Sequence, residues 1–187
     1  MGKVIALINI TADGFCDSHY VNANAEFHEF VHPLLAGADD VGFGRNSFEL
    51  FQQVWPAVLE KESPPESQLR MARALTDKSK LVFSQTLEDF TWHNSAIIKL
   101  ADPDFISRYR EAGSGDLLTI GSPGLVASLT QQDLVDDYYF SVQPIIAGGG
   151  GVRLFDKFQL DERKQLVFLQ STALASGVII NHYQRKS

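Results

Sequence analysis

The sequence predicts an α/β fold: one three-layer domain with a mixed, mostly parallel sheet, an antiparallel C-terminal end and helices on both faces. Three observations support this prediction. The 187 residues suit a single domain, taken here as residues 1–187. Apolar, strand-like runs alternate with helical patterns through most of the chain. Strands then dominate the end, near residues 138–146, 165–169 and 177–183.

The expected strands of the parallel part are short apolar runs bounded by turn signals. The first covers residues 4–8; it is continuous and rich in β-branched residues, which predicts burial on both faces. Four more are expected at residues 41–44, 80–84, 96–100 and 117–120.

Helices are expected between these strands. Residues 24–36 carry one apolar stripe made of Phe27, Phe30, Val31, Leu34 and Leu35, and Gly37 is expected to end this helix. Further helices are predicted from residues 45–49, over 69–75, from Asp102 and Pro103 to Gly113, and after Gly124. The prolines at positions 56, 64 and 65 predict a surface loop over residues 56–66.

The charge balance and the single cysteine exclude several classes of protein. Sixteen basic and 23 acidic residues give a net charge of −7, which argues against a nucleic-acid binder and a polybasic membrane contact. Cys16 stands alone, so an intramolecular disulfide and a multi-cysteine zinc site are excluded; it is interpreted as a bystander. No apolar run reaches the ~18 residues of a membrane span, and no targeting signal is present, so the cytosol is the expected location.

The common nucleotide and hydrolase motifs are missing. There is no P-loop, no GxGxxG after the first strand, no HExxH and no GxSxG. No metal is expected. His28 and His32 stand four apart on a predicted helix and offer a shared metal as an alternative, but two solvated histidines beside the apolar stripe are the preferred interpretation.

Three strand ends run into polar or glycine-rich turns, at residues 44–47, 84–86 and 121–124. In open α/β sheets, ligands bind outside the carboxyl ends of the strands. A nucleotide cofactor is therefore expected there, the alternative being that the turns only start helices.

The last of these turns is the best candidate for a phosphate site. Ser122 is expected to cap the next helix, with Pro123 in its first turn. Free N–H groups and the helix dipole would then face a phosphate, which Gly121 and Gly124 allow to approach. Arg45 and Ser84 would serve a second phosphate.

An ordered series of segments between residues 10 and 155 resembles the dihydrofolate reductase-like family. Residues 10–15 resemble its SLDG-F segment, 44–49 its G-R-x-[TS]-[YF]-E, and 80–87 its K-x-V-x-S-x-T-L strand. Residues 118–125 resemble its glycine-rich strand-to-helix turn, 134–138 its L-[VI]-D-E-x, 144–150 its P-V-x-x-G-x-G, and 154–155 its LF. The closest branch is the riboflavin-biosynthesis reductase, which is the C-terminal half of the bifunctional deaminase–reductase, with its stand-alone bacterial relatives.

The resemblance implies NADPH as the cofactor and hydride transfer to a small heterocyclic acceptor, pyrimidine- or pterin-like. For the 2′-phosphate side of the cofactor it implies Gly44, Arg45, Asn46, Ser47, Ser84, Gln85 and Thr86. For the pyrophosphate it implies Ile120, Gly121, Ser122, Gly124, Leu125 and Val126. For the nicotinamide it implies Ala6, Ile10, Gly14 and Phe15.

Two features depart from the family pattern. Ser122 stands where dihydrofolate reductases have a second glycine, and the deaminase half with its zinc motifs is absent. No residue clearly matches the ribose-phosphate site of the riboflavin enzyme, so the motifs support the cofactor better than any acceptor.

Two carboxylates are candidate proton donors. Glu26 lies about 40° from Phe30 around the predicted helix, so it is able to reach a cleft; the alternative is an ordinary acid in a first helical turn. Asp13 is expected near the opening of the same cleft. The alternative interpretation of Asp13 is an Asx-turn residue before Gly14.

The leading prediction is an NADPH-dependent reductase with a small-molecule substrate. The alternatives are 5-amino-6-(5-phosphoribosylamino)uracil reductase of riboflavin biosynthesis and a non-catalytic nucleotide-binding protein. A homodimer is expected because related stand-alone proteins commonly pair and because the strand-rich end leaves sheet edges that need cover.

Overall fold

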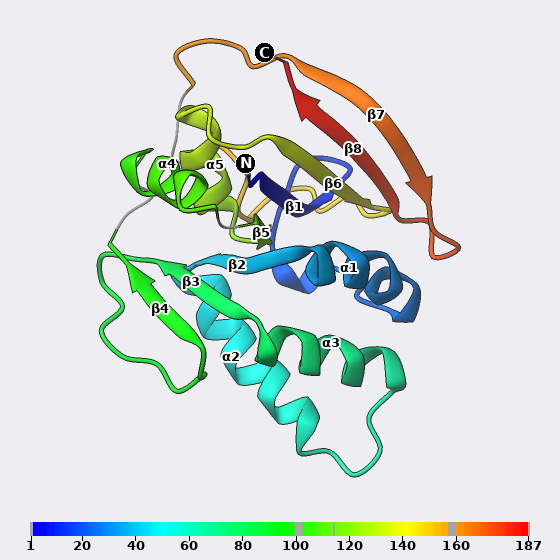
Figure 1. The fold of residues 1–187 in the computed structure, drawn as a ribbon. Helices are drawn as coiled ribbons and strands as arrows, with labels where there is room; N and C mark the ends of the chain where they lie inside the picture. The colour runs from blue at the N-terminus through cyan, green and yellow to red at the C-terminus, as the bar shows by residue number, and fades with distance from the viewer. Residues whose placement is uncertain (1, 100–102, 114, 157–159, 187) are drawn as a thin grey trace.

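The computed structural model describes residues 2–99, 103–113, 115–156 and 160–186. Within these ranges, eight strands form one sheet in the order β4-β3-β2-β5-β1-β6-β8-β7 (Figure 1). Neighbours from β4 to β6 pair in parallel, whereas β8 pairs antiparallel with both β6 and β7. The predicted mixed sheet with an antiparallel C-terminal end is confirmed.

The strand at the centre is β1 (Val4–Thr11), which pairs with β5 on one side and β6 on the other. Its first five residues are buried, as the continuous apolar run predicts. The other strands are β2 (Ala38–Gly44), β3 (Ser79–Phe83), β4 (Ser95–Ile98), β5 (Asp116–Ile120), β6 (Asp137–Gln143), β7 (Leu166–Ala173) and β8 (Ile179–Arg185).

Helices cover both faces of the sheet and complete the three layers (Figure 1). One face carries α1 (Ala25–Gly37), α2 (Arg45–Leu59) and α3 (Glu66–Asp77), whose apolar side chains share one core cluster with β2. The other face carries α4 (Pro103–Glu111) and α5 (Pro123–Gln131), which share a second cluster with β1. A short 3₁₀ helix, η1 (Ser18–Tyr20), follows β1. Among the described helices, none has both the length and the apolar character that a membrane span requires.

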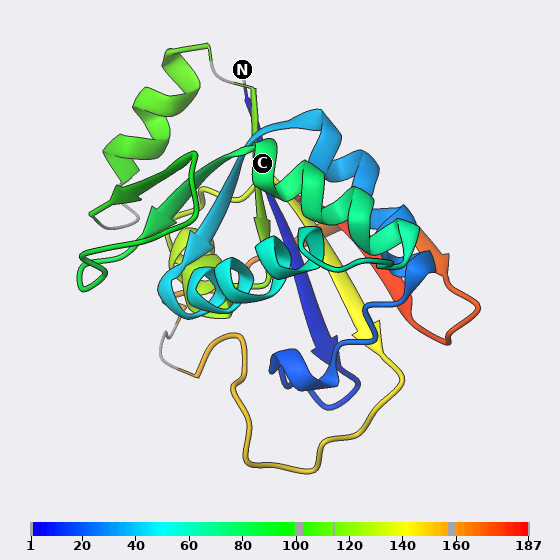
Figure 2. The same ribbon diagram turned by 90° about the horizontal axis from the view of Figure 1, so that it is seen from below.

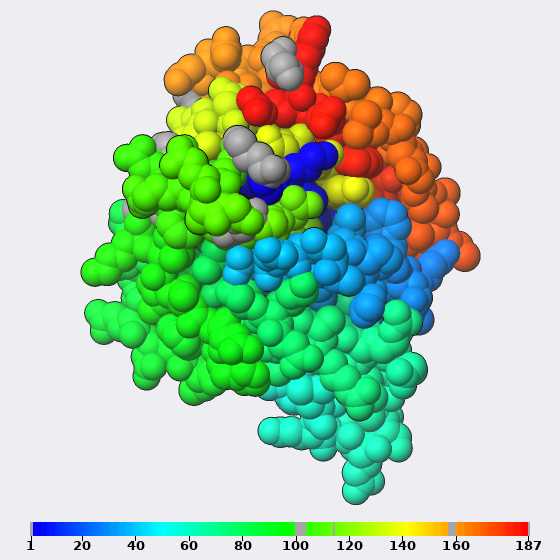
Figure 3. Space-filling model, in the orientation of Figure 1, coloured from blue at the N-terminus to red at the C-terminus, as the bar shows by residue number. Residues whose placement is uncertain are grey.

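The predicted loop over residues 56–66 is wrong in its first part, because α2 continues through Pro56 to Leu59. Proline removes one helical hydrogen bond. That loss is offset here by packing, since Val58 is buried beyond the proline. The connecting turn is thus residues 60–65, and it projects from the body of the molecule (Figure 3).

The strand predicted over residues 138–146 is β6, and it ends at Gln143, because Pro144 lacks the N–H that would continue the ladder. Gly37 is the last residue of α1, as predicted, but it does not adopt the left-handed conformation of a glycine stop. The predicted strand end at Leu100 and the predicted helix cap at Asp102 lie outside the described residues.

The parallel order places the carboxyl ends of β1, β2, β3 and β5 along one edge of the sheet. Figure 2 shows this end of β1 and β6 beside η1 and the loop of residues 144–156. Helices α2 and α5 begin at the same edge, directly after β2 and β5. Two helix N-termini and two loops therefore surround the position where the sequence predicts a ligand.

Candidate active site

A cavity of about 1110 Å³ opens at this edge of the sheet. Its lining comes from the ends of β1, β2, β3 and β5, from one side of α1 and α2, from the start of α5, and from residues 151–156. Cavities of 300–1,000 Å³ are typical of sites for cofactors and drug-sized molecules. This cavity therefore has room for a cofactor and a second small molecule.

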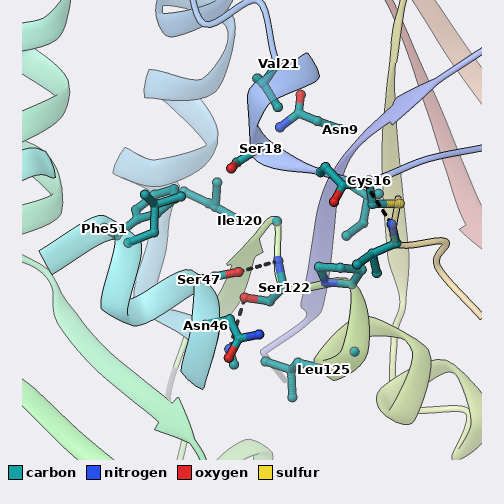
Figure 4. Close-up of a pocket in the computed structure, with 18 of the residues that line it drawn as sticks. Asn9, Cys16, Ser18, Val21, Asn46, Ser47, Phe51, Ile120, Ser122 and Leu125 are labelled. Atoms are coloured by element: carbon teal, nitrogen blue, oxygen red, sulfur yellow. Dashed lines mark hydrogen bonds between the residues drawn. The ribbon is translucent and has the colours of Figure 1, made fainter. Parts of the chain in front are cut away.

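The three turns that the sequence singled out meet in this cavity. Twelve of the predicted cofactor residues line it: Gly44, Arg45, Asn46, Ser47, Ser84, Gln85, Thr86, Ile120, Gly121, Ser122, Gly124 and Leu125. Hydrogen bonds join the turns directly, since the Arg45 guanidinium donates to the Thr86 hydroxyl at 3.0 Å. The close-up in Figure 4 shows a second link, in which the Ser122 N–H donates to the Ser47 hydroxyl at 3.0 Å.

Both helices at the cavity begin without a side-chain cap. Gly44 precedes α2 and has no side chain to offer, and Ser122 precedes α5 without capping it. The first-turn N–H groups of each helix therefore lack helical partners, and each helix dipole directs partial positive charge at the cavity. Two such N-termini side by side form an environment that favours an anion such as a diphosphate.

The predicted role of Ser122 as a helix cap is wrong. Its backbone is left-handed, with φ 56° and ψ 54°, and its hydroxyl instead accepts the N–H of Gly44 at 3.0 Å. Gly121 also has a positive φ, 66°. The chain thus turns sharply through two left-handed residues, which brings the β2 and β5 ends together and leaves the α5 N–H groups free.

Arg45 and Ser84 lie at the same end of the cavity. The Arg45 Nε donates to Glu49 at 2.8 Å, one turn along α2, so the guanidinium is held in place but remains half-exposed. The Ser84 hydroxyl accepts the N–H groups of Thr86 and Leu87 and so shapes the turn after β3. Its proton stays available to a ligand oxygen, because accepting these bonds does not use it.

The residues predicted to hold the nicotinamide are not brought into the cavity. Ala6 and Phe15 are buried, and Ile10 and Gly14 line a smaller, adjoining hollow that shares Arg153, Leu154 and Asp156 with the cavity. Val126, predicted for the pyrophosphate, is likewise buried, on the side of α5 that faces the core. The same β1 segment contributes instead Ile8, Asn9 and Cys16 to the lining.

Asp13, a predicted proton donor, does not line the cavity and anchors the loop after β6. Its Oδ1 accepts the Thr11 hydroxyl at 2.7 Å and the Ala147 N–H at 3.0 Å, and its Oδ2 accepts the Gly148 N–H at 2.8 Å. These hydrogen bonds lower the pKa of Asp13 to about 2. The carboxylate is therefore ionised at neutral pH and fully engaged in holding the glycine-rich loop.

Glu26 is engaged in a similar way at the other side of the molecule. Its carboxylate accepts the N–H groups of Ala175 at 2.7 Å and Ser176 at 3.4 Å, in the turn between β7 and β8. The neighbouring Phe27 lines the cavity, and Glu26 does not. Neither predicted proton donor faces the cavity, because each carboxylate fastens a distant loop.

The loop of residues 144–156 closes one side of the cavity. The Asp17 carboxylate accepts the Val152 N–H at 2.8 Å, and the Cys16 N–H donates to the Val152 carbonyl at 2.7 Å. A Cβ at Gly151 would collide with the Asp17 carboxylate and the Phe15 ring, so a larger residue there would displace the Asp17 side chain from this contact. Burial raises the pKa of the Cys16 thiol to about 11, which keeps it protonated.

Sequence reasoning missed an apolar wall on the opposite side. It consists of Phe27 and Val31 from α1, Leu50, Phe51, Val54 and Trp55 from α2, and Met71 from α3. The signal was present, because positions 47, 50, 51, 54 and 55 recur at helical spacing on one face of α2. It was overlooked because an apolar helix face is ordinarily interpreted as a core-facing face.

The histidines of α1 also differ from the prediction. His28 is buried and lines the cavity, with its ring 5.8 Å from that of Trp55. Burial lowers its pKa, so the imidazole is neutral at physiological pH. Among the residues that the structure describes, no three His, Cys, Asp or Glu side chains gather in a group able to hold a metal.

Comparison with known proteins adds a sequence relative and two structural neighbours. The uncharacterized protein YyaP of Bacillus subtilis (strain 168) is 23% identical over 185 residues, which cover 95% of this chain and 92% of that protein. A putative riboflavin biosynthesis protein from Shewanella sp. PV-4 has a TM-score of 0.75 at 20% identity, with 99% of each chain covered. A pyrimidine reductase-like protein from Corynebacterium diphtheriae has a TM-score of 0.71 at 13% identity, covering 100% of this chain and 92% of that one.

These structural likenesses establish a shared fold. The sequence itself is matched by the family model of the RibD C-terminal domain over residues 2–180. The resemblance drawn from the ordered motifs is therefore confirmed, and the chain belongs to the RibD C-terminal domain family.

Proposed function

We propose that this protein is an NADPH-dependent reductase that transfers a hydride to a small planar heterocyclic acceptor. The observation that carries the proposal is the meeting of two uncapped helix N-termini, at Gly44 and Ser122, in one cavity. Membership of the RibD C-terminal domain family supports it. The likeness in fold to a protein described as pyrimidine reductase-like is consistent with it.

The residues around these N-termini fit a dinucleotide. Gly124 lies in the first turn of α5, and a Cβ there would meet no heavy atom within 4 Å, so the backbone is open to a ligand. The N–H groups at the starts of α2 and α5 would bind the pyrophosphate, and Arg45, Ser84 and Thr86 would bind the 2′-phosphate. When bound, NADPH supplies a hydride with two electrons, which together with one proton reduces a double bond of the acceptor.

The remainder of the cavity would orient the acceptor and exclude water. Phe51 offers flat apolar surface, while Asn9 and Ser18 across the cavity offer hydrogen-bonding groups (Figure 4). Trp55, one turn along α2 from Phe51, adds to the apolar surface. The proposal includes no carboxylate general acid, because Asp13 and Glu26 are both held by backbone N–H groups elsewhere.

Binding and turnover together test the proposal. Calorimetry with NADPH and NADH measures cofactor affinity, and an acceptor screen over pterins, pyrimidines and quinones measures NADPH oxidation. A reductase binds NADPH more tightly than NADH and oxidises it with at least one acceptor. Stabilisation by NADPH without oxidation by any acceptor would favour the non-catalytic alternative, and failure to bind either cofactor would refute the proposal.

We further propose a cytosolic homodimer that pairs through β7. This strand is the edge of the sheet, and its Val167, Phe168 and Leu169 are exposed. Unpaired edges with apolar side chains are prone to uncontrolled pairing, so a two-fold contact would protect them. A monomeric mass by light scattering at micromolar concentration would contradict this proposal.

A further inference from the structure

The apolar wall of the cavity extends well beyond the phosphate-binding turns. Along α2 the cavity is lined successively by Ser47, Leu50, Phe51, Val54 and Trp55. At 1.5 Å per residue, these eight steps carry the wall about 12 Å away from the turn after β2. The polar end of the cavity thus lies at the start of α2, and the apolar end lies two turns further along.

Two side chains of this wall are unusually exposed for their type. Leu50 is 39% exposed and Val54 is 45% exposed, although both lie inside the lining of the cavity. Single apolar side chains on a convex surface need no explanation. Inside a cavity, the same exposure marks apolar area that an apolar ligand would remove from water.

Positive charge is scarce at this end. Among the described residues that line the cavity, the lysines and arginines amount to Arg45 and Arg153. Arg45 stands at the turn after β2 and is paired with Glu49, whereas Arg153 lies over the Phe15 ring at 4.4 Å. Neither belongs to the apolar wall.

We call the part of the cavity between the apolar wall and Asn9 and Ser18 the acceptor half. The ionisable groups around it disfavour an anionic ligand. His28 lines the cavity beside Trp55 of the wall, and burial lowers its pKa and keeps it neutral. The carboxylates of Asp17 and Asp156 accept the N–H groups of Val152 and Arg153, so they lie beside Arg153 and offset its positive charge. A phosphate placed against the wall would lose its hydration without gaining a cation.

We propose that the acceptor half of this cavity selects an uncharged, flat aromatic molecule without a phosphate group, an inference that deepens the proposed function and rests on it. Ring stacking and burial against Phe51, Val54 and Trp55 supply the affinity. Polar groups such as Asn9 and Ser18 orient the ring. The acceptor is then a free heterocycle and not a ribose phosphate.

Binding of 1-naphthol and 1-naphthyl phosphate tests this selection, because the two probes differ by the phosphate alone and neither is reduced. Calorimetry is performed with saturating NADP⁺, which keeps the probes away from the helix N-termini. We expect the wild type to bind 1-naphthol at least tenfold more tightly than 1-naphthyl phosphate. Equal or tighter binding of the phosphate, or no binding of 1-naphthol, would overturn the inference.

A cation added to the wall should reverse the selection. Val54→Arg places a guanidinium in the acceptor half at an exposed position, and we expect it to strengthen 1-naphthyl phosphate binding about tenfold. Gln53→Arg is the matched control, since Gln53 is the adjacent exposed residue of α2 and does not line the cavity. Equal effects of the two variants would overturn the inference.

The same measurements separate this inference from the proposed function. The affinity for NADP⁺ is obtained before either probe is added. Loss of NADP⁺ binding would refute the reductase. The difference between Val54→Arg and Gln53→Arg in affinity for 1-naphthyl phosphate would then still test the wall, because both variants keep the same helix N-termini. Normal NADP⁺ binding with a preference for the phosphate probe would refute the acceptor class alone.

Discussion

Gly124 provides the sharpest test of the cofactor site. In Gly124→Leu, a side chain enters the first turn of α5, where an added Cβ meets no protein atom within 4 Å. The fold should therefore be retained, and replacement of a helical glycine stabilises by up to about 1 kcal/mol. A bound pyrophosphate would occupy that space, so the leucine would remove its contacts with the α5 N–H groups.

The expected loss follows from those contacts. A hydrogen bond to a charged group contributes about 1.5–3 kcal/mol, which corresponds to roughly ten- to a hundredfold in affinity for each bond lost. Thermal unfolding and NADPH calorimetry on the same sample give both quantities. Gly37→Leu is the control, because Gly37 is also helical, also has open space around its Cβ, and does not line the cavity. A folded Gly124→Leu protein with wild-type affinity for NADPH would refute the phosphate site.

Gly121 is less suitable for this test, although it is the first glycine of the turn over residues 121–124. Its φ of 66° is a conformation that side chains rarely adopt, and Gly121→Val would add roughly 1–3 kcal/mol of backbone strain. Loss of fold and loss of binding would then occur together. The structure thus separates the two glycines: one is needed for the turn, and the other leaves room for a ligand.

Three further predictions concern charge. Arg45→Ala should reduce the preference for NADPH over NADH about ten- to a hundredfold and leave NADH affinity nearly unchanged; equal losses for both cofactors by calorimetry would contradict a 2′-phosphate contact. Asp13→Asn should lower the melting temperature at neutral pH, and the difference in melting temperature between wild type and variant should disappear as the pH falls from about 4 towards 2. The reason is that the folded-state pKa of Asp13 is lowered from 3.8 to about 2, so its contribution is present above the unfolded-state pKa and disappears in acid; an unchanged difference at pH 2 would count against the anchor. Lys80→Met should cost at least about 2 kcal/mol in urea unfolding, because the buried ammonium donates to three carbonyl oxygens near the end of α3, and a stability equal to wild type would show that these bonds contribute nothing.

Local sequence determined the layers and the edge at which the site lies. A continuous apolar run such as residues 4–8 is buried on both faces in any parallel sheet, so its central position follows from composition. Asn24 is a good helix cap in any context, and its side chain accepts the Phe27 N–H at 2.9 Å. Turns after parallel strands converge by topology, which is why the segments at Gly44, Ser84 and Gly121 meet as predicted.

Only the tertiary structure decided what the polar and apolar side chains of the site do. Asp13 and Glu26 were ambiguous because their hydrogen-bond partners, the N–H groups of residues 147–148 and 175–176, lie more than a hundred residues away in the chain. Ser122 accepts the N–H of Gly44 from another strand end, a contact that no local pattern encodes. An apolar stripe on α2 has the same period whether it faces the core or a cavity, and the packing of α3 against both α1 and α2 determined which part of it stays open to a ligand.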